Sequence, residues 1–336
     1  MNWTRDDASL RSRFRHAVRL AAIPDGSALI LGVSGGSDSL ALLDLVSRES
    51  GSRGWRPHVV HVDHGWRPDS AQDAQEVRKA ARSLGLSSTG LRIQPAAWTR
   101  AKGRSREAAA RALRRQGLRS VARRTGAAAI LLGHTRDDQI ETILLHLLRG
   151  TGIRGLVGME LRRGLWVRPL LEVGRSELRD YLGRRELPWR DDPSNTDLAF
   201  LRNRVRHKLL PLIESEIRPG VGKVLLRMSD ALGSLETRQR REVAECWKAL
   251  APRRVHGAIR LDRPQLSTYD PDLVEGILQR AFRAVSPTGF HLGQAHLRAL
   301  EQAVRDPVPR QFDLPAGVRA FVNTHEVRLV VSAGME

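Results

Sequence analysis

A short run of glycine, serine and aspartate residues has the composition of a phosphate-binding loop: Ser34-Gly35-Gly36-Ser37-Asp38-Ser39. Its two glycines let the backbone turn sharply and approach a ligand without a clash from a Cβ atom. Its serines add hydroxyl donors, and a helix that follows directs free N–H groups and the positive end of its dipole at the same point. These residue types in this order indicate a pyrophosphate site.

The setting of this run separates a binding loop from a flexible connector. The run lies between the apolar segment Ala28–Val33, expected as a buried strand, and the amphipathic segment Leu40–Ser47, expected as a helix. In this position we expect the run to be a ligand-binding loop rather than a flexible spacer. The run lacks the Gly-Lys-Ser/Thr of P-loop ATPases. In place of that lysine, Asp38 is expected to hold a Mg²⁺ ion that bridges the phosphates.

A second candidate site lies within residues 133–142, where His134, Asp138 and Glu141 occur at spacings of four and three. On a helix these spacings put side chains close to one face. Asp137 and Asp138 also fit simple capping of a helix N-terminus, but only one of them can cap. An acid, a base and a further carboxylate that converge at the end of a strand favour a functional site.

Two other patterns are interpreted structurally. His61, Asp63 and His64 lie close together, but on a strand and its exit rather than at the i, i+4 positions of a helical zinc pair. Structural or adenine-pocket roles are preferred for them. Residues 150–155 match the dinucleotide pattern G-x-G-x-x-G, yet they follow an expected helix rather than a strand. A loop or a helix end explains that match better.

The first half of the chain alternates strand-like and helix-like segments. Strands are expected at Ala28–Val33, Pro57–Val62, Ser87–Ile93 and Ala127–Gly133, and helices at Ser39–Arg48, Ser70–Leu84, Ser105–Arg124 and Asp137–Arg149. This alternation predicts an α/β fold, a parallel sheet with helices on both faces. Ligands of such sheets bind at the carboxyl ends of the strands, where both candidate sites lie.

Beyond Gly150 the alternation fades. Residues 200–216 carry an apolar stripe at near-helical spacing, although Pro211 is expected to kink or end that helix. A hinge is expected at residues 218–220, followed by a helical stretch to about Leu250, shorter helices at Pro271–Val285 and Leu292–Val304, and short strands to Val331. These segments predict a smaller, helix-rich α+β domain. We therefore expect a first domain at residues 1–216 and a second at 217–336.

The charge of the chain favours a polyanionic partner. Lys and Arg number 56 against 37 Asp and Glu, a net charge of +19. Each phosphate neutralised by such a surface releases condensed counterions, although a genome that prefers arginine codons is an alternative explanation. Part of this positive surplus lies in one expected helix, in Arg111, Arg114, Arg115, Arg119, Arg123 and Arg124. We interpret most of these arginines as a solvated or RNA-facing surface. One or two of their side chains would reach inward to phosphates.

Cysteine content and hydropathy limit the protein class. The single cysteine, Cys246, excludes an intramolecular disulfide and a Cys-rich metal site within one chain. No apolar run approaches the roughly 18 residues of a membrane-spanning helix. The N-terminal residues lack the apolar core of a signal peptide. A cytoplasmic protein that does not enter the membrane is expected.

Together the motifs resemble those of the tRNA(Ile)-lysidine synthetases, a family of the N-type ATP pyrophosphatase superfamily. The likeness covers residues 28–215, and a weaker likeness to that family's tRNA-binding domain follows. It runs through these segments: Val33–Ser39, His61–Gly65, Gly133–Thr142, Leu147–Gly152, Arg168–Leu171, Asp192–Asn195 and Arg202–Arg206.

The resemblance implies a two-step ligation that uses ATP and Mg²⁺. ATP adenylates the C2 oxygen of the wobble cytidine in the CAU anticodon of tRNA(Ile), and pyrophosphate is released. The side-chain amine of free L-lysine then attacks C2 and expels AMP, which leaves lysidine. The expected partners are therefore this tRNA and lysine. The oligomeric state stays open, with a homodimer as one option.

The resemblance also carries roles to individual residues. Residues 34–39 would bind ATP, and Asp38 with Asp138 would hold Mg²⁺ or orient lysine. Further catalytic members would be His134, Glu141 and Arg114. Arg202 and Arg206 would contact phosphate or tRNA. One departure is visible, because Arg115 stands where the family pattern has an aromatic residue after the arginine, and this affects the expected local packing.

Three rival functions remain for comparison. A tRNA thiolation enzyme of the same superfamily needs catalytic or cluster-binding cysteines, and Cys246 is alone. A synthetase of the amidotransferase type that acts on a small molecule would not need the basic surplus. A non-catalytic RNA-binding protein with a dead nucleotide fold would not need an intact Asp38, His134, Asp138 and Glu141.

Overall fold

The computed structural model describes residues 4–63, 65, 70–94, 106–190, 193–286 and 290–331. The chain forms two compact units, one of residues 1–151 and 155–229 and the other of residues 152–154 and 230–336. The main division falls inside helix α11 (Val221–Leu250), later in the chain than the boundary expected after residue 216. Among the described helices, none combines the length and apolar character that crossing a lipid bilayer requires.

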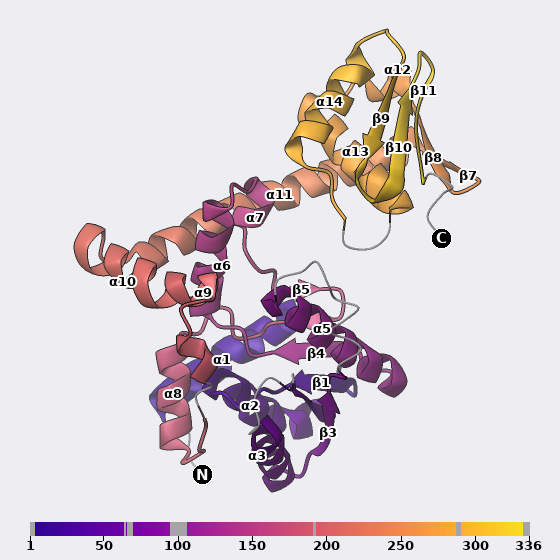
Figure 1. The fold of residues 1–336 in the computed structure, drawn as a ribbon. Helices are drawn as coiled ribbons and strands as arrows, with labels where there is room; N and C mark the ends of the chain where they lie inside the picture. The colour runs from indigo at the N-terminus through magenta and orange to yellow at the C-terminus, as the bar shows by residue number, and fades with distance from the viewer. Residues whose placement is uncertain are drawn as a thin grey trace. The chain divides into compact units, whose positions relative to one another are not determined.

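A six-stranded sheet organises the first unit, and its strand order is β3-β2-β1-β4-β6-β5 (Figure 1). All neighbouring strands pair in parallel except β5 and β6, which are antiparallel. The bounds are β1 Ala28–Gly32, β2 Arg56–Asp63, β3 Ser87–Arg92, β4 Ala129–Leu132, β5 Arg162–Arg163 and β6 Trp166–Val167. The predicted α/β fold is confirmed, and β1 to β4 match the four expected strands.

Helices connect these strands and cover both faces of the sheet. Those that follow β1 to β4 are α2 Ser37–Arg53, α3 Ser70–Ser83, α5 Arg106–Thr125 and α6 Arg136–Leu148. The others are α1 Arg5–Leu20, α7 Ile153–Leu156, α8 Arg175–Arg184, η1 Pro193–Thr196, α9 Leu201–Arg204, η2 Val205–Leu209, α10 Leu210–Leu212 and η3 Ile213–Ile217. The G-x-G-x-x-G match at residues 150–155 begins after α6 and runs into α7, so it follows a helix rather than a strand, as expected.

The central strand β1 is apolar throughout because both of its faces are covered. Leu29 and Leu31 point into the core that α1, α2 and α8 share. Ile30, on the opposite face, packs in the core that contains Leu118 and Val121 of α5. This two-sided burial fixes the end of β1, and with it the start of the candidate phosphate loop.

A buried hydrogen-bond network ties α2 to α8. The hydroxyl of Tyr181 donates to Oδ2 of Asp44, and Nε of Arg48 donates to the same oxygen at 2.7 Å. Arg185 Nε lies 3.9 Å from it. The Asp44 side chain is 1% exposed, so its charge depends on these partners. The network joins the middle of α2 to the second half of α8.

The segment around Pro211 differs from the expected kink or end. Helical backbone angles continue from α9 through η3, and Pro211 stands at the start of α10. The turns on both sides of α10 are π-helical. Wider turns leave room for a proline ring and for the hydrogen bond that proline cannot donate, so the helical path survives.

The second unit is an antiparallel sheet packed against helices, as the expected α+β domain requires. Its strand order is β7-β8-β11-β10-β9. Its elements after α11 are β7 Arg253–Val255, β8 Ala258–Asp262, α12 Arg263–Leu266, α13 Pro271–Val285, α14 Gln294–Arg305, β9 Arg310–Leu314, η4 Pro315–Gly317, β10 Val318–Val322 and β11 Glu326–Val331. Val318, Ala320 and Val322 alternate inward and share a core with α13 and α14. The sequence did not indicate β7 and β8.

Replacing Asp44 tests the tie between α2 and α8. Asp44→Ala leaves the guanidinium of Arg48 and the hydroxyl of Tyr181 without their buried acceptor, so we expect a loss of about 3 kcal/mol in the free energy of unfolding. The matched control is Asp25→Ala, which removes an exposed partner of Arg53 and should cost less than about 0.5 kcal/mol. Urea unfolding measures both, and equal losses would contradict the tie.

Candidate active site

The loop after β1 is held in shape by its own hydroxyl groups. The N–H of Ser34 donates to Oγ of Ser39 at 3.2 Å, and that hydroxyl donates to the carbonyl of Gly36 at 3.0 Å. Gly35 has a φ of +94°, a conformation that side chains rarely permit. Gly36 is the N-cap of α2 and offers no side chain to that helix end. The helix N-terminus therefore faces the loop with the polarity that phosphate groups require.

The end of β4 packs directly against the first turn of α2. A Cβ atom at Gly133 would lie 2.7 Å from the carbonyl oxygen of Asp38 and 3.0 Å from the nitrogen of Ser39. Both atoms belong to the backbone and cannot swing away as a side chain end can. Glycine at this position therefore lets the segment after β4 reach the phosphate loop.

The first turn of α6 uses Asp138 both as a cap and as a charged group. Its Oδ2 accepts from the backbone N–H of Thr135 at 2.9 Å, and its own N–H donates to Oγ1 of Thr135 at 3.4 Å, which forms a capping box. Its other oxygen, Oδ1, faces the arginines described below. Asp137 accepts from the N–H of Arg175 at 2.8 Å and so binds the start of α8. Asp138 therefore combines helix capping with ion pairing.

Asp38, Asp138 and Glu141 form an acidic cluster that arginines link together. Arg175 bridges the first two, with Nε 3.2 Å from Asp38 Oδ2 and Nη2 3.2 Å from Asp138 Oδ1. Arg202 lies 3.0 Å from Asp138 and 2.7 Å from Glu141. Four elements distant in sequence thus meet at the carboxyl end of the sheet.

Arg206 completes this network. Its Nε lies 2.6 Å from Oε1 of Glu141, and its Nη2 lies 3.4 Å from Asp138. The Glu141 side chain is 1% exposed, so its charge is compensated by guanidinium groups rather than by water. The expected contacts of Arg202 and Arg206 with phosphate or tRNA stay a prediction. In this structure their guanidinium groups pair with carboxylates.

The two aspartates of the cluster have opposite pKa shifts. Burial raises the pKa of Asp38, Arg175 lowers it, and the charge of Asp138 raises it, with a net result above the usual value. Burial also acts to raise the pKa of Asp138, but Arg202, His134 and Arg175 outweigh it and hold that pKa below the usual value. Asp138 therefore keeps its charge more firmly than Asp38 does.

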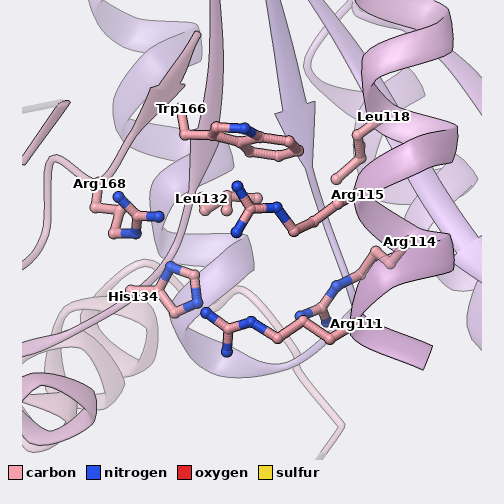
Figure 2. A pocket seen from close by; sticks show the side chains of 8 residues that line it. All are labelled: Arg111, Arg114, Arg115, Leu118, Leu132, His134, Trp166 and Arg168. Atoms are coloured by element: carbon pink, nitrogen blue, oxygen red, sulfur yellow. The ribbon is translucent and has the colours of Figure 1, made fainter. Parts of the chain in front are cut away.

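His134 and Arg114 lie in a neighbouring pocket rather than in the acidic cluster. Figure 2 shows the polar and aromatic groups that we call the cationic pocket: Arg111, Arg114, Arg115, His134, Trp166 and Arg168. Burial, with the charges of Arg168, Arg111 and Arg114, lowers the pKa of His134 to about 3. Its imidazole is therefore neutral at physiological pH, and the buried Nδ1 has no hydrogen-bond partner.

His61 has a structural position. Its Nδ1 donates to the carbonyl of Val33 at 3.0 Å, which fastens β2 to the start of the phosphate loop. This agrees with the structural role preferred for it. His64 and Asp192, which belong to two of the motifs, lie outside the described residues.

The comparison with known proteins matches most of the first unit to a described family. Residues 8–213 match the model of the PP-loop domain family. A tRNA(Ile)-lysidine synthase of Thermobifida fusca is 36% identical over 330 residues, which is 97% of each chain. That of Streptomyces coelicolor is 36% identical over 290 residues, 85% of this chain and 80% of the relative.

The chain belongs to the tRNA(Ile)-lysidine synthase family. The match to the Thermobifida fusca relative extends through both compact units, so membership covers the whole chain. It confirms the resemblance that the motifs indicated, and it identifies the enzyme class as an ATP-dependent ligase.

A solved structure supports the fold of the first unit. A U34-tRNA thiolase from Methanococcus maripaludis superposes with a TM-score of 0.58 at 14% identity, over 68% of this chain and 79% of that one. At this identity the likeness concerns the fold alone. Cys246, the sole cysteine, lies on α11 and packs partly buried against the core of the second unit.

Arg175 was not singled out in the sequence, although it bridges the acidic cluster. Its position at the first residue of α8 could have indicated a carboxylate partner, because a cation at a helix N-terminus is unfavourable in the field of the helix dipole. Such an arginine needs a carboxylate nearby. Arg168 appeared only as part of a motif, and no spacing rule connects it with His134.

Gly133→Ala tests the contact between β4 and the phosphate loop. The added methyl group must displace backbone atoms of Asp38 and Ser39, so we expect about tenfold weaker ATP binding, with a stability loss of about 1–3 kcal/mol. The matched control is Gly51→Ala in α2, where a Cβ meets nothing within 4 Å. Helix propensity makes that change neutral or stabilising. Calorimetric titration with ATP checks both, and unchanged affinity in Gly133→Ala would contradict the contact's importance.

Proposed function

We propose that this chain joins L-lysine to C2 of the wobble cytidine in the CAU anticodon of tRNA(Ile). The C2 oxygen of the cytidine attacks the α-phosphorus of ATP, and pyrophosphate leaves. The lysine side-chain amine then attacks C2 and loses a proton, and AMP leaves with the oxygen. One observation carries this proposal within the family: the phosphate loop and the acidic cluster form one connected site, joined by Asp38 and Arg175.

The loop at Ser34–Ser39 would hold the phosphates of ATP. Its glycines allow close backbone approach, and the N-terminus of α2 supplies N–H donors and a positive dipole end. Charge that develops on the departing pyrophosphate is stabilised by donors that are already in position. The loop contributes mainly orientation and charge stabilisation, which suits phosphoryl chemistry.

Mg²⁺ fits this site through Asp38 and Asp138. The ion commonly takes one or two carboxylates together with nucleotide phosphates. Within the described ranges, no group of three or more His, Cys, Asp or Glu side chains offers a complete metal site, so phosphate oxygens would be needed. Arg175 already bridges the two carboxylates as a cation. When bound, Mg²⁺ would neutralise phosphate charge, and Arg175 would give up part of its contacts.

Asp138 and Glu141 would orient the cationic lysine substrate. They already hold guanidinium groups at hydrogen-bonding distances, so the site has the charge and geometry for an ammonium group. His134 is a poor proton acceptor because its pKa lies near 3. Asp38 has a pKa above the usual carboxylate value, so we propose it as the acceptor of the amine proton. His134 and Arg114 would act by hydrogen bonding and charge from the adjacent pocket.

The second part of the chain and the setting of the enzyme are proposed by the same reasoning. Residues 217–336 would bind tRNA, in keeping with the family likeness, and the net charge of +19 of the whole chain favours an RNA partner. We propose a cytoplasmic location, because tRNA, ATP and lysine are all available in the cytoplasm. A homodimer stays a prediction, which light scattering decides.

The direct test supplies purified protein with ATP, Mg²⁺ and radiolabelled lysine. We expect label on a tRNA(Ile) transcript with a CAU anticodon, and none on the same transcript with U in place of the wobble C. Absence of label on the first transcript, alongside an active relative as a positive control, would overturn the proposed function.

Asp138→Asn separates charge from folding. The amide oxygen can still accept the N–H of Thr135 and keep the helix cap. Loss of the charge should lower lysine transfer by about 100-fold or more. The matched control is Asp180→Asn, an exposed residue on α8, which should leave transfer unchanged. Near-normal transfer in Asp138→Asn would remove this carboxylate from the mechanism.

A further inference from the structure

The cationic pocket differs from the acidic cluster because arginines predominate among the side chains that line it. Its arginines come from α5 and from the residue after β6, and its histidine follows β4 (Figure 2). Within the described ranges, no ion pair joins Arg114, Arg115 or Arg168 to a carboxylate. Arg168 instead donates from Nη1 to the carbonyl of Glu160 at 2.8 Å. Burial lowers the pKa of Arg168 although the charge of Glu160 acts to raise it, and the pKa values of Arg114 and Arg115 are lowered by burial and by neighbouring arginines.

Trp166 forms the wall on which the arginines are arranged. The guanidinium of Arg115 lies 4.6 Å from the centroid of its indole ring, and that of Arg119 lies 5.6 Å away. Trp166 is 2% exposed and belongs to the core between β4 and α5, so this wall is rigid. The ring comes from β6 and position 115 supplies a stacked cation.

Several polar atoms in the pocket are buried and unpaired. Nδ1 of His134, Nε of Arg168 and Nε1 of Trp166 have no hydrogen-bond partner. Buried polar atoms normally find partners, so an unpaired group needs an explanation such as a bound ligand or ion. Burial, and next the charge of Arg111, lowers the pKa of Arg114 and of Arg168 to about 10 each. An anion between these groups would relieve both their repulsion and their missing contacts.

We propose that the cationic pocket is a phosphate-binding subsite in which Arg115, stacked on Trp166, and Arg168 hold the group. This inference rests on the proposed function, because the phosphate comes from one of its two substrates. The cavity now left between the side chains measures about 10 Å³, which suits a single water molecule. A phosphate would therefore take space now filled by guanidinium ends, which sit on flexible chains.

The tRNA backbone is the favoured source of this phosphate. The phosphates of ATP already have a loop of their own at Ser34–Ser39, and the pocket lies beside it, next to Gly133 and His134. A nucleotide whose base reaches the acidic cluster needs its phosphodiester held nearby. Guanidinium groups are suited to phosphate because they offer paired donors in one plane.

The experiment compares Arg115→Gln with a matched control on the same helix, Arg123→Gln. Both changes remove one arginine charge, but Arg123 is exposed in the last turn of α5. Binding of the tRNA(Ile) transcript is measured without ATP at several salt concentrations, and binding of inorganic pyrophosphate is measured separately. Circular dichroism and urea unfolding check that each variant folds.

We expect Arg115→Gln to bind the transcript about tenfold more weakly, and to lower the slope of log affinity against log salt by about one. Arg123→Gln should change affinity less than about twofold. Arg115→Lys keeps the charge and loses the planar stack, so it should keep the slope and recover part of the affinity. Weaker pyrophosphate binding alone would instead identify ATP as the source of the phosphate.

Two outcomes would overturn the subsite. Equal losses in Arg115→Gln and Arg123→Gln would show a diffuse field rather than a pocket, and unchanged binding of both probes would show no phosphate at Arg115. Failure of the proposed function can be distinguished from failure of the subsite. In the former case the wild-type protein would not transfer lysine to the tRNA, whatever the tRNA affinity of the two arginine variants.

Discussion

The burial of three carboxylates beside a phosphate-binding loop is the constraint on which the first unit depends. Asp38, Asp138 and Glu141 lie close together, and buried charges of one sign are tolerated only when cations and hydrogen bonds compensate them. Arg175, Arg202 and Arg206 provide this compensation from α8, α9 and η2. The need to neutralise the cluster therefore brings together helices that the sheet alone would not place.

The two charged regions at the carboxyl end of the sheet are suited to opposite substrates. The acidic cluster pairs with guanidinium groups, and we propose that it also holds the lysine substrate and Mg²⁺. The cationic pocket is lined mainly by arginines, and we propose that it holds a phosphate group. His134 follows Gly133 between them and is kept neutral by burial and by the arginines. Separate regions of opposite charge let an anionic RNA and a cationic amino acid approach one reaction centre.

The fold and the phosphate loop could be predicted because their signals are local. The glycine–serine run is adjacent in sequence to the apolar strand β1 and to the helix that follows. Each of these segments therefore supports the interpretation of its neighbours. The partners of Arg202 and Arg206 could not be read in this way, since Glu141 lies about 60 residues earlier in the chain. Arg175 and Trp166 were missed for the same reason. The continuation of the helix through Pro211 depends on π-helical turns on both sides of α10, and no sequence pattern predicts such turns.

The central claim is that the Ser34–Ser39 loop directs transfer of the adenylyl group of ATP to RNA. It is tested most directly by incubating the protein with Mg²⁺ and the tRNA(Ile) transcript in the absence of lysine, with ATP labelled at either the α or the γ phosphate. We expect the RNA to carry label from the α phosphate only. Addition of lysine should release this label as AMP. Label from the γ position, or none from either, would contradict the central claim.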